Sequence, residues 1–153
     1  MTVGLVIVSH SEKLASGVTE LAQQMTQGSI TIVAAGGADN GVIGTSVDTI
    51  QQAIERANGP DGVLVLLDMG SAILSTEMAL EMIDEEQRGR VLLSFAPIVE
   101  GTLAAALEAT LGHTLQEVKA AAEKAASKAQ LQSLKPITQA EETTNELDDT
   151  VQQ

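Results

Sequence analysis

Two residues of this sequence, His10 and Asp68, have side chains that could together transfer a chemical group. A neutral imidazole has a lone pair that can take up a phosphoryl group. A carboxylate that accepts a hydrogen bond from one ring nitrogen fixes the tautomer and leaves the other nitrogen free. Each residue follows a short apolar run, at residues 3–8 and 63–67. The pair therefore predicts nucleophilic chemistry at a histidine, if the fold brings these two runs side by side.

Each of these features also has a simpler interpretation. A single histidine after a strand is often only a polar side chain in an exposed loop, and an aspartate before a helix often only caps it. Gly36 and Gly37 could let the backbone approach a ligand closely, or they could simply make a turn. The other histidine, His113, lies between two predicted helices, and we interpret it as a surface or capping residue.

The apolar runs predict a sheet that would place His10 and Asp68 at one edge. Apart from one glycine, residues 3–8 are aliphatic without alternation, which is typical of a strand covered on both faces. Helical patterns separate this run from further strands predicted at residues 30–35, 63–67 and 90–95. Right-handed crossovers then predict an α/β fold with an open parallel four-stranded sheet and helices on both faces. With the strand order 2-1-3-4, ligands bind at the carboxyl ends of the first and third strands, where His10 and Asp68 lie.

The first predicted helix starts beside His10. Ser9 and Glu12 have the S-x-x-E spacing of a capping box, which places His10 in the first helical turn. Backbone amides without intrahelical partners and the helix dipole favour a bound dianion there. The apolar stripe of this helix is predicted at four positions, Leu14, Val18, Leu21 and Met25.

Similar spacings predict where other helices start. Capping-box spacings occur from Thr45 to Asp48 and from Thr114 to Glu117, before the second and the last predicted helix. An alanine-rich helix is expected from Gly101 onward, after the fourth strand.

The third helix is expected to contribute both to the site and to the core. It opens with Gly70 and Ser71, whose amides and hydroxyl could bind phosphate oxygens. It is predicted to continue to about residue 86, with Met78 and Met82 in the core.

Composition limits the classes of function. The 153 residues fit one domain, expected at residues 1–128, followed by a flexible acidic tail or linker at residues 129–153. The formal net charge of -13 would repel nucleic acid and an anionic membrane alike, and only 1% of residues are aromatic, so neither partner is expected. The absence of cysteine rules out disulfides and thiolate metal sites. We find no signal peptide or membrane span, and the cytoplasm is the expected location.

Four segments in this order carry a resemblance to a known family. They are Val-Ser-His-Ser at residues 8–11, Gly-Gly at 36–37, Ile-Gly-Thr-Ser at 43–46 and Leu-Asp-Met-Gly-Ser-Ala at 67–72. Together they resemble the phosphotransferase subunits of phosphoenolpyruvate-dependent dihydroxyacetone kinases. Those subunits are related to the mannose-type enzyme IIA domains of bacterial sugar phosphotransferase systems. The resemblance covers residues 1–128.

The resemblance implies a phosphohistidine carrier. His10 would accept a phosphoryl group from the carrier protein HPr and pass it to ADP on the nucleotide-binding kinase subunit, with Asp68 as its hydrogen-bonding neighbour. No metal or organic cofactor is implied. The residues implied to line the phosphate site are Ser11, Gly36, Gly37, Thr45, Gly70 and Ser71.

The resemblance also implies partners and leaves alternatives. The nucleotide-binding and dihydroxyacetone-binding kinase subunits would be partners in glycerol metabolism, and relatives form homodimers, for which the apolar fourth-helix region could provide the contact. One alternative is an enzyme IIA of a mannose-type sugar system, which passes its phosphoryl group to a histidine of an enzyme IIB. Another is a non-catalytic regulatory module that binds a partner through the same crevice.

Overall fold

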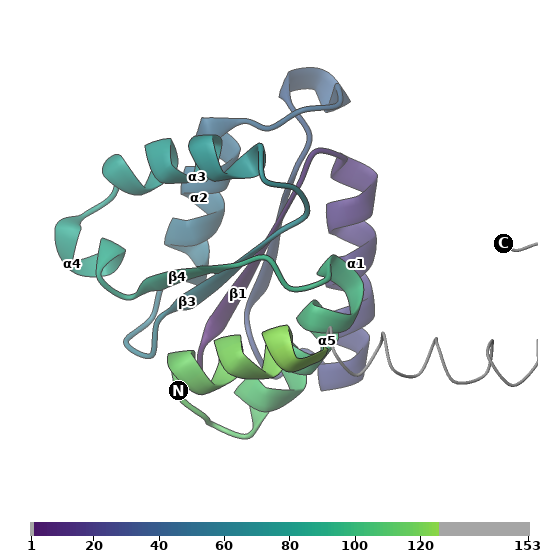
Figure 1. Cartoon of the computed structure of the whole chain (residues 1–153), viewed down its shortest axis with the longest axis vertical. Helices are drawn as coiled ribbons and strands as arrows, with labels where there is room; N and C mark the ends of the chain where they lie inside the picture. Colours follow the sequence, from purple (N-terminus) through teal and green to yellow (C-terminus); the bar gives the residue numbers. More distant parts are fainter. Residues whose placement is uncertain (1, 126–153) are drawn as a thin grey trace, which may run out of the picture.

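The computed structural model describes residues 2–125, and their centre is a four-stranded parallel sheet. Its strands lie in the order β2-β1-β3-β4, which confirms the predicted α/β fold and strand order (Figure 1). The four strands are β1 (Gly4–Ser9), β2 (Ile32–Gly36), β3 (Val63–Leu67) and β4 (Val91–Ser94). The predicted tail at residues 129–153 lies outside the described residues.

Helices cover both faces of this sheet, as Figure 1 shows. One face carries α1, α5 and the helical residues 115–125, and the other carries α2 and α3. The helical elements with printed bounds are α1 (Glu12–Thr26), the short 3-10 helix η1 (Asp39–Gly41), α2 (Val47–Ala57), α3 (Ala72–Glu81), α4 (Glu85–Arg88) and α5 (Ile98–Thr110). Within the described range, no helix is both long and apolar enough to cross a membrane.

Two hydrophobic clusters, one on each face of the sheet, form the core. Successive side chains of a strand point to opposite faces, so Leu5 and Ile7 of β1 join the cluster under α1 and α5, whereas Val6 and Val8 join the cluster under α2 and α3. All of β1 and β3 is buried, which explains why their sequences are apolar without alternation.

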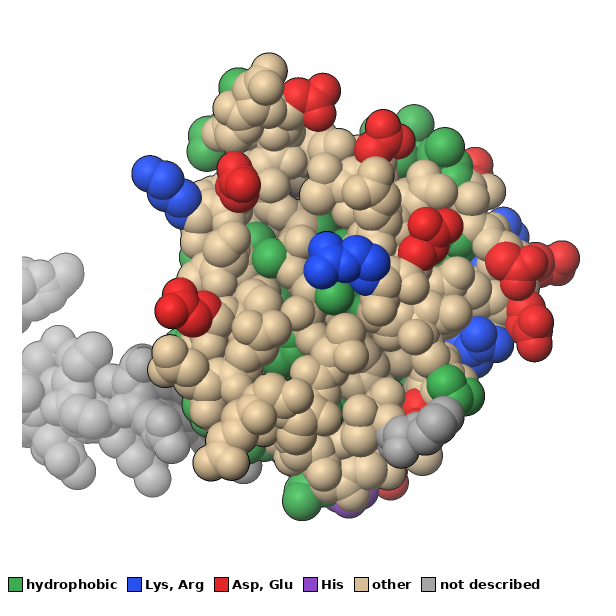
Figure 2. Space-filling view, turned by 180° about the vertical axis from the view of Figure 1, so that it is seen from behind, with side chains coloured by type: hydrophobic (Ala, Val, Ile, Leu, Met, Phe, Trp, Pro, Cys, Tyr) green, Lys and Arg blue, Asp and Glu red, His purple; other side chains and the backbone are tan. Residues whose placement is uncertain are grey.

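Figure 2 shows that acidic and basic side chains are interspersed over the surface on the side away from the viewer of Figure 1.

The predicted apolar stripe of α1 is wrong for three of its four residues. Val18 is buried, but Leu14, Leu21 and Met25 are 39%, 43% and 43% exposed. The buried face lies beside that stripe and consists of Ala15, Val18, Thr19, Ala22 and Thr26. It is built mostly of small residues because α1 packs closely against β2, where a larger side chain would not fit.

The prediction that Met78 and Met82 lie in the core is also wrong. These side chains are 50% and 57% exposed, while small residues of α3, including Ala72 and Ala79, face the sheet. The helix ends at Glu81 instead of continuing to residue 86, and the short helix α4 follows it separately. After β4, the helix α5 begins at Ile98, directly after Pro97 and three residues earlier than predicted.

The predicted capping boxes have different outcomes. The last one is confirmed: the Thr114 amide donates to Glu117 Oε1 at 2.9 Å, and the Glu117 amide donates to Thr114 Oγ1 at 3.2 Å. The second is displaced by one residue, because Ser46 caps α2 by accepting from the Thr49 amide.

The first capping box is wrong in a way that bears on the site. Ser11, and not Ser9, caps α1, since its Oγ accepts a hydrogen bond from the Leu14 amide at 3.1 Å. Ser9 remains in β1, where it is paired with Gly36. His10 therefore lies between strand and helix, and not in the first helical turn.

Candidate active site

The backbone of His10 is held from two sides at the carboxyl end of β1. Its amide donates a 3.0 Å hydrogen bond to Asp68 Oδ2, directly after the neighbouring strand β3. Its carbonyl oxygen accepts a 2.9 Å hydrogen bond from the Gly44 amide, in the loop after β2. Three segments that are distant in the sequence thus meet at this residue, where the winding of the sheet reverses.

Both ring nitrogens of His10 have partners. Nδ1 lies 3.0 Å from Asp68 Oδ1, and Nε2 lies 2.8 Å from Ser71 Oγ. A carboxylate can only accept, so in the neutral imidazole Nδ1 carries the hydrogen and Nε2 has the lone pair, toward which the Ser71 hydroxyl donates. The His10 side chain is 17% exposed and that of Asp68 11%, so the ring can be reached from solvent on one side while its orientation is fixed.

Asp68 is itself oriented by Ser9, for which the spacing to Glu12 predicted a helix cap. Ser9 is fully buried; its Oγ donates to Asp68 Oδ2 at 2.9 Å and accepts from the Ser11 amide at 3.0 Å. Burial raises the pKa of the Asp68 carboxyl, but hydrogen bonds from the His10 amide, the His10 ring and Ser9 outweigh burial and hold this pKa below its ordinary value of 3.8. Asp68 is therefore ionised at neutral pH, as an acceptor for Nδ1–H must be.

The start of α3 supplies donors beside Nε2. Ser71 precedes the helix, and its hydroxyl makes no capping hydrogen bond because it contacts His10 instead. Within residues 2–125, neither the Gly70 amide nor the Ser71 amide donates a hydrogen bond to another group. Both residues are exposed, and their amides, together with the helix dipole, form a favourable place for a dianion. Asp68 does not cap α3, so the simpler interpretation of this residue is wrong.

Gly36, the last residue of β2, and Gly37, the next residue, shape the backbone around His10. A Cβ atom at Gly36 would lie 2.6 Å from the Ser11 carbonyl oxygen and 2.7 Å from Ala15 Cβ, so only glycine lets α1 start this close to β2. The Gly37 amide donates to the Ser9 carbonyl oxygen at 3.1 Å and is thus already occupied. Both glycines therefore contact the residues that flank His10 in the sequence, and they stabilise the backbone of this segment.

The remaining two site residues have occupied hydroxyls. Ser11 Oγ caps α1, as described above. Thr45 Oγ1 lies 2.6 Å from Ser75 Oγ on α3, a residue outside the predicted site. The signal for Ser75 was its position four residues after Ser71, which puts both on the same side of the helix.

His113 is far from this arrangement. It is exposed and contacts Glu108 at the end of α5. The neighbouring Leu115 packs close to Gly62, just before the amino end of β3, so His113 lies at the end of the sheet opposite to His10. The hydrogen bond with Glu108 raises the pKa of His113. Among the residues described, no cluster of three metal-ligating side chains of His, Cys, Asp or Glu type occurs.

The fold and the site define a class of protein: an open parallel α/β domain with one carboxylate-oriented histidine at the switch point of its sheet. Residues 4–119 match the EIIA-man family, described as "PTS system fructose IIA component". The chain belongs to this family, as the resemblance implied.

Individual relatives agree with this assignment. The chain is 48% identical over 119 residues to the phosphoryl donor subunit DhaM of the PEP-dependent dihydroxyacetone kinase of Escherichia coli (strain K12), covering 76% of this chain and 25% of that protein. It is 38% identical over 124 residues to the phosphotransferase subunit DhaM of the PTS-dependent dihydroxyacetone kinase of Lactococcus lactis subsp. lactis (strain IL1403), covering 81% and 96%. The chain thus spans about a quarter of the first relative's length and nearly all of the second's.

A solved structure supports the fold. The protein EF1359, of unknown function, superposes with a TM-score of 0.72 at 34% sequence identity, covering 81% of this chain and 95% of that one.

Proposed function

We propose that this chain is the phosphohistidine carrier of a dihydroxyacetone kinase. His10 accepts a phosphoryl group from the phosphohistidine of HPr and transfers it to ADP on the nucleotide-binding kinase subunit. The observation that carries this proposal is the imidazole whose Nδ1–H is held by an ionised Asp68, which places the lone pair on Nε2, where the Ser71 hydroxyl donates to it. The phosphoryl donor role named for the relatives supports the same reaction.

Each half of the proposed reaction exchanges one bond to phosphorus for another. The Nε2 lone pair of His10 attacks the phosphorus of the donor, a new N–P bond forms, and the donor's N–P bond breaks with its electron pair returning to the donor imidazole. In the second half, an oxygen of the ADP β-phosphate attacks, and the pair of the broken bond returns to Nε2. The hydrogen stays on Nδ1 throughout. Asp68 accepts a hydrogen bond from it, and its negative charge balances positive charge on the ring.

Local donors would hold the phosphorylated form although the protein is acidic. A phosphoryl group adds close to two negative charges, and the formal net charge is already -13. The Ser71 hydroxyl, 2.8 Å from Nε2, would turn from the ring to a phosphoryl oxygen when the N–P bond forms, and the amides of Gly70 and Ser71 beside it have no other acceptor among the described residues. Short-range hydrogen bonds to a charged acceptor outweigh screened repulsion from distant carboxylates.

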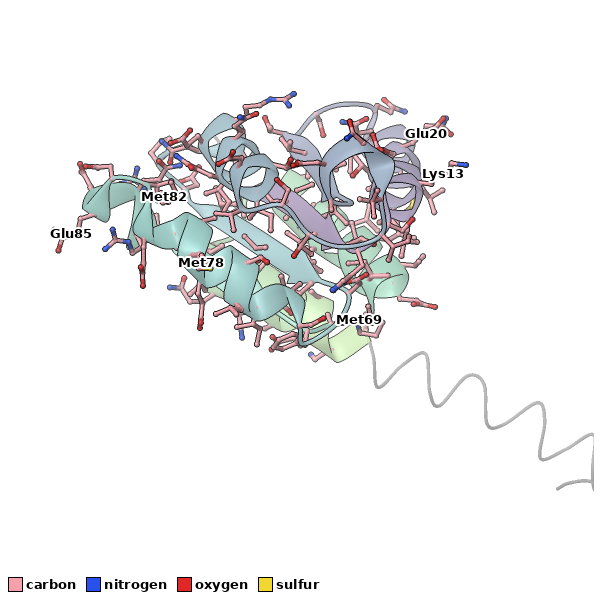
Figure 3. The ribbon with its side chains drawn as sticks, turned by 90° about the horizontal axis from the view of Figure 1, so that it is seen from above. Lys13, Glu20, Met69, Met78, Met82 and Glu85 are labelled. Atoms are coloured by element: carbon pink, nitrogen blue, oxygen red, sulfur yellow. The ribbon has the colours of Figure 1, made fainter. Side chains whose placement is uncertain are left out.

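Exposed apolar side chains near His10 would contact the donor and acceptor proteins, because both must bring a reacting atom up to Nε2. Val42 and Ile43, in the loop after β2, are 60% and 71% exposed. Met69 directly follows Asp68, and Met78 lies farther along α3, as Figure 3 shows. Flexible methionine side chains suit a surface that must fit two different partners.

Three further expectations belong to this proposal. We propose a homodimer, supported by the exposed apolar side chains of Leu107 on α5 and Leu111 just after it. We propose that residues 1–128 form the carrier domain and that residues 129–153 are an acidic tail or linker. We propose the cytoplasm as the location of the chain, because ADP and an HPr donor are both supplied there.

Reconstituted transfer tests the proposal and its alternatives. The chain is mixed with enzyme I, HPr and labelled phosphoenolpyruvate, and the labelled product is offered either ADP on the nucleotide-binding subunit or an enzyme IIB. We expect labelling of the chain and transfer to ADP. Transfer only to enzyme IIB would instead identify a sugar-system enzyme IIA, and a chain that HPr cannot label would favour a regulatory module.

A further inference from the structure

One side-chain hydrogen bond joins the two segments that hold His10. Thr45 Oγ1 and Ser75 Oγ lie 2.6 Å apart, both half-buried, and either hydroxyl can donate. Thr45 ends the loop after β2, and Ser75 lies in the first turn of α3. In the part of the chain that the structure describes, no other hydrogen bond links residues 38–46 to residues 69–76.

These two segments act on opposite ends of the same residue. Gly44, next to Thr45, donates its amide to the His10 carbonyl oxygen at 2.9 Å. Ser71, one helical turn before Ser75, places its hydroxyl 2.8 Å from His10 Nε2. The Thr45–Ser75 hydrogen bond therefore closes a ring of contacts that runs from the backbone of His10 to its reacting nitrogen.

The loop has few other means of keeping its position. Among the described residues, no side chain of 38–46 belongs to either core cluster, and the apolar residues Val42 and Ile43 are exposed. Gly44 has a φ of 146°, a conformation that other residues rarely adopt, so its amide direction depends on the loop being held. A segment without buried apolar contacts depends on its hydrogen bonds for local order.

We propose that Ser75, acting through Thr45, is a positioning residue for phosphoryl transfer at His10. Its hydroxyl binds Thr45 and so keeps the Gly44 amide at the His10 carbonyl oxygen. This contact fixes the position of Nε2 relative to the donors at the start of α3. Ser75 touches neither the ring nor the phosphoryl group. This inference rests on the proposed function for the reaction whose rate it sets, but the link itself can be measured without that reaction.

Hydrogen exchange and chemical labelling test the link. The variants Ser75→Ala and Thr45→Val each remove one hydroxyl, and Thr45→Ser keeps it. We expect the Gly44 amide to exchange about 2- to 10-fold faster in the first two, the effect of one neutral hydrogen bond, and at the parental rate in Thr45→Ser. Labelling of His10 by phosphoramidate, which transfers its phosphoryl group with loss of ammonia, should slow by a similar factor at unchanged half-saturation.

A double variant and a matched control decide the interpretation. Because both single variants remove the same hydrogen bond, Thr45→Val with Ser75→Ala should be no slower than the slower single variant. Ser94→Ala also removes a serine hydroxyl that donates at 3.0 Å, to Glu123, and should change neither Gly44 exchange nor labelling. Parental Gly44 exchange in Ser75→Ala, or effects of the two substitutions that multiply, would overturn the inference.

These readouts separate this inference from the proposed function. If HPr does not label the parental chain, the proposed function fails, whereas Gly44 exchange and phosphoramidate labelling still report on the link. If HPr labels the parental chain and Ser75→Ala equally fast, the positioning role fails and the proposed function stands.

Discussion

The two histidines of this chain are each paired with a carboxylate, yet their surroundings differ. His10 is held through its amide as well as its ring by Asp68, and its second ring nitrogen meets Ser71. His113 contacts Glu108, five residues earlier in the sequence, and its side chain is 43% exposed against 17% for His10. An ion pair on the surface can form and break freely, whereas a ring fixed at both nitrogens has one tautomer and one direction of attack.

The comparison shows that a histidine–carboxylate pair is not by itself a site. What distinguishes His10 is the fold: two parallel strands end side by side and bring a carboxylate, a buried serine and the start of a helix around one ring. At His113 there is only a local contact between the end of one helix and the start of the next. The following predictions test this difference, beginning with the largest effect.

Replacing each histidine with alanine should have opposite effects on phosphoryl labelling. We expect His10→Ala to lose all phosphoryl label in the reconstituted system, while His113→Ala keeps the parental level. The label should be lost in mild acid and survive alkali, as expected of a phosphoramidate on a ring nitrogen. Label that persists in His10→Ala would move the chemistry to another residue.

Removing the carboxylate partner should have the next largest effect. Asp68→Ala leaves Nδ1 without its acceptor, so we expect phosphoryl transfer to slow by roughly 10- to 1000-fold, the range typical of orienting and charge-stabilising groups. Circular dichroism should show that the chain still folds. The matched substitution at the other pair, Glu108→Ala, should leave transfer unchanged, and a parental rate in Asp68→Ala would contradict the proposed pairing.

Removing Ser9 tests whether Asp68 itself needs support. Ser9→Ala removes one of the hydrogen bonds that hold the Asp68 carboxylate, and it also removes the acceptor of the Ser11 amide. The carboxylate keeps its hydrogen bonds to His10. We expect transfer to slow by about 10-fold, the effect of one hydrogen bond to a charged group. Stopped-flow measurement of label transfer would show this, and a loss as large as that of Asp68→Ala would mean that Ser9 holds the whole site.

The pair at His113 should affect stability, and only within a pH window. Its contact with Glu108 raises the pKa of His113 above 6.5, so folding favours the protonated ring. This contribution is fully present below pH 6.5 and is lost as the pH rises through the raised pKa. His113→Ala should therefore lower the melting temperature slightly at pH 5.5 and not at pH 9. Glu108→Gln should remove the same pH dependence; an equal shift at both pH values would contradict this assignment.

Truncation should have the smallest effect. Cutting after Lys128 should leave the melting temperature and the labelling of His10 nearly unchanged, because residues 130–153 carry no periodic apolar stripe that could join a core. Thermal unfolding of the short and full chains would measure this. A large drop in melting temperature would show that the tail belongs to the folded domain.

The apolar pattern was enough to predict the four strands and, once the strand order 2-1-3-4 was assumed, the position of the central pair of residues. Continuous apolar runs such as residues 63–67 indicate strands buried on both faces, and the right-handed crossover rule restricts how they connect. Ligands bind where the winding of such a sheet reverses, which identified His10 and Asp68 before their side chains were placed. The family resemblance followed from short segments at those same loops.

Which helix residues are buried, and which partner each serine takes, depend on how distant segments pack together. Leu21 and Met78 look like core residues in a periodic pattern, but the sheet accepts alanines there because the helices lie close to it. Ser9 orients Asp68, 59 residues away, and Ser75 bonds to Thr45, 30 residues away. Local spacing predicts a cap wherever a serine stands three residues before a glutamate. The partner that the hydroxyl actually binds depends on which distant segments the fold brings close to it.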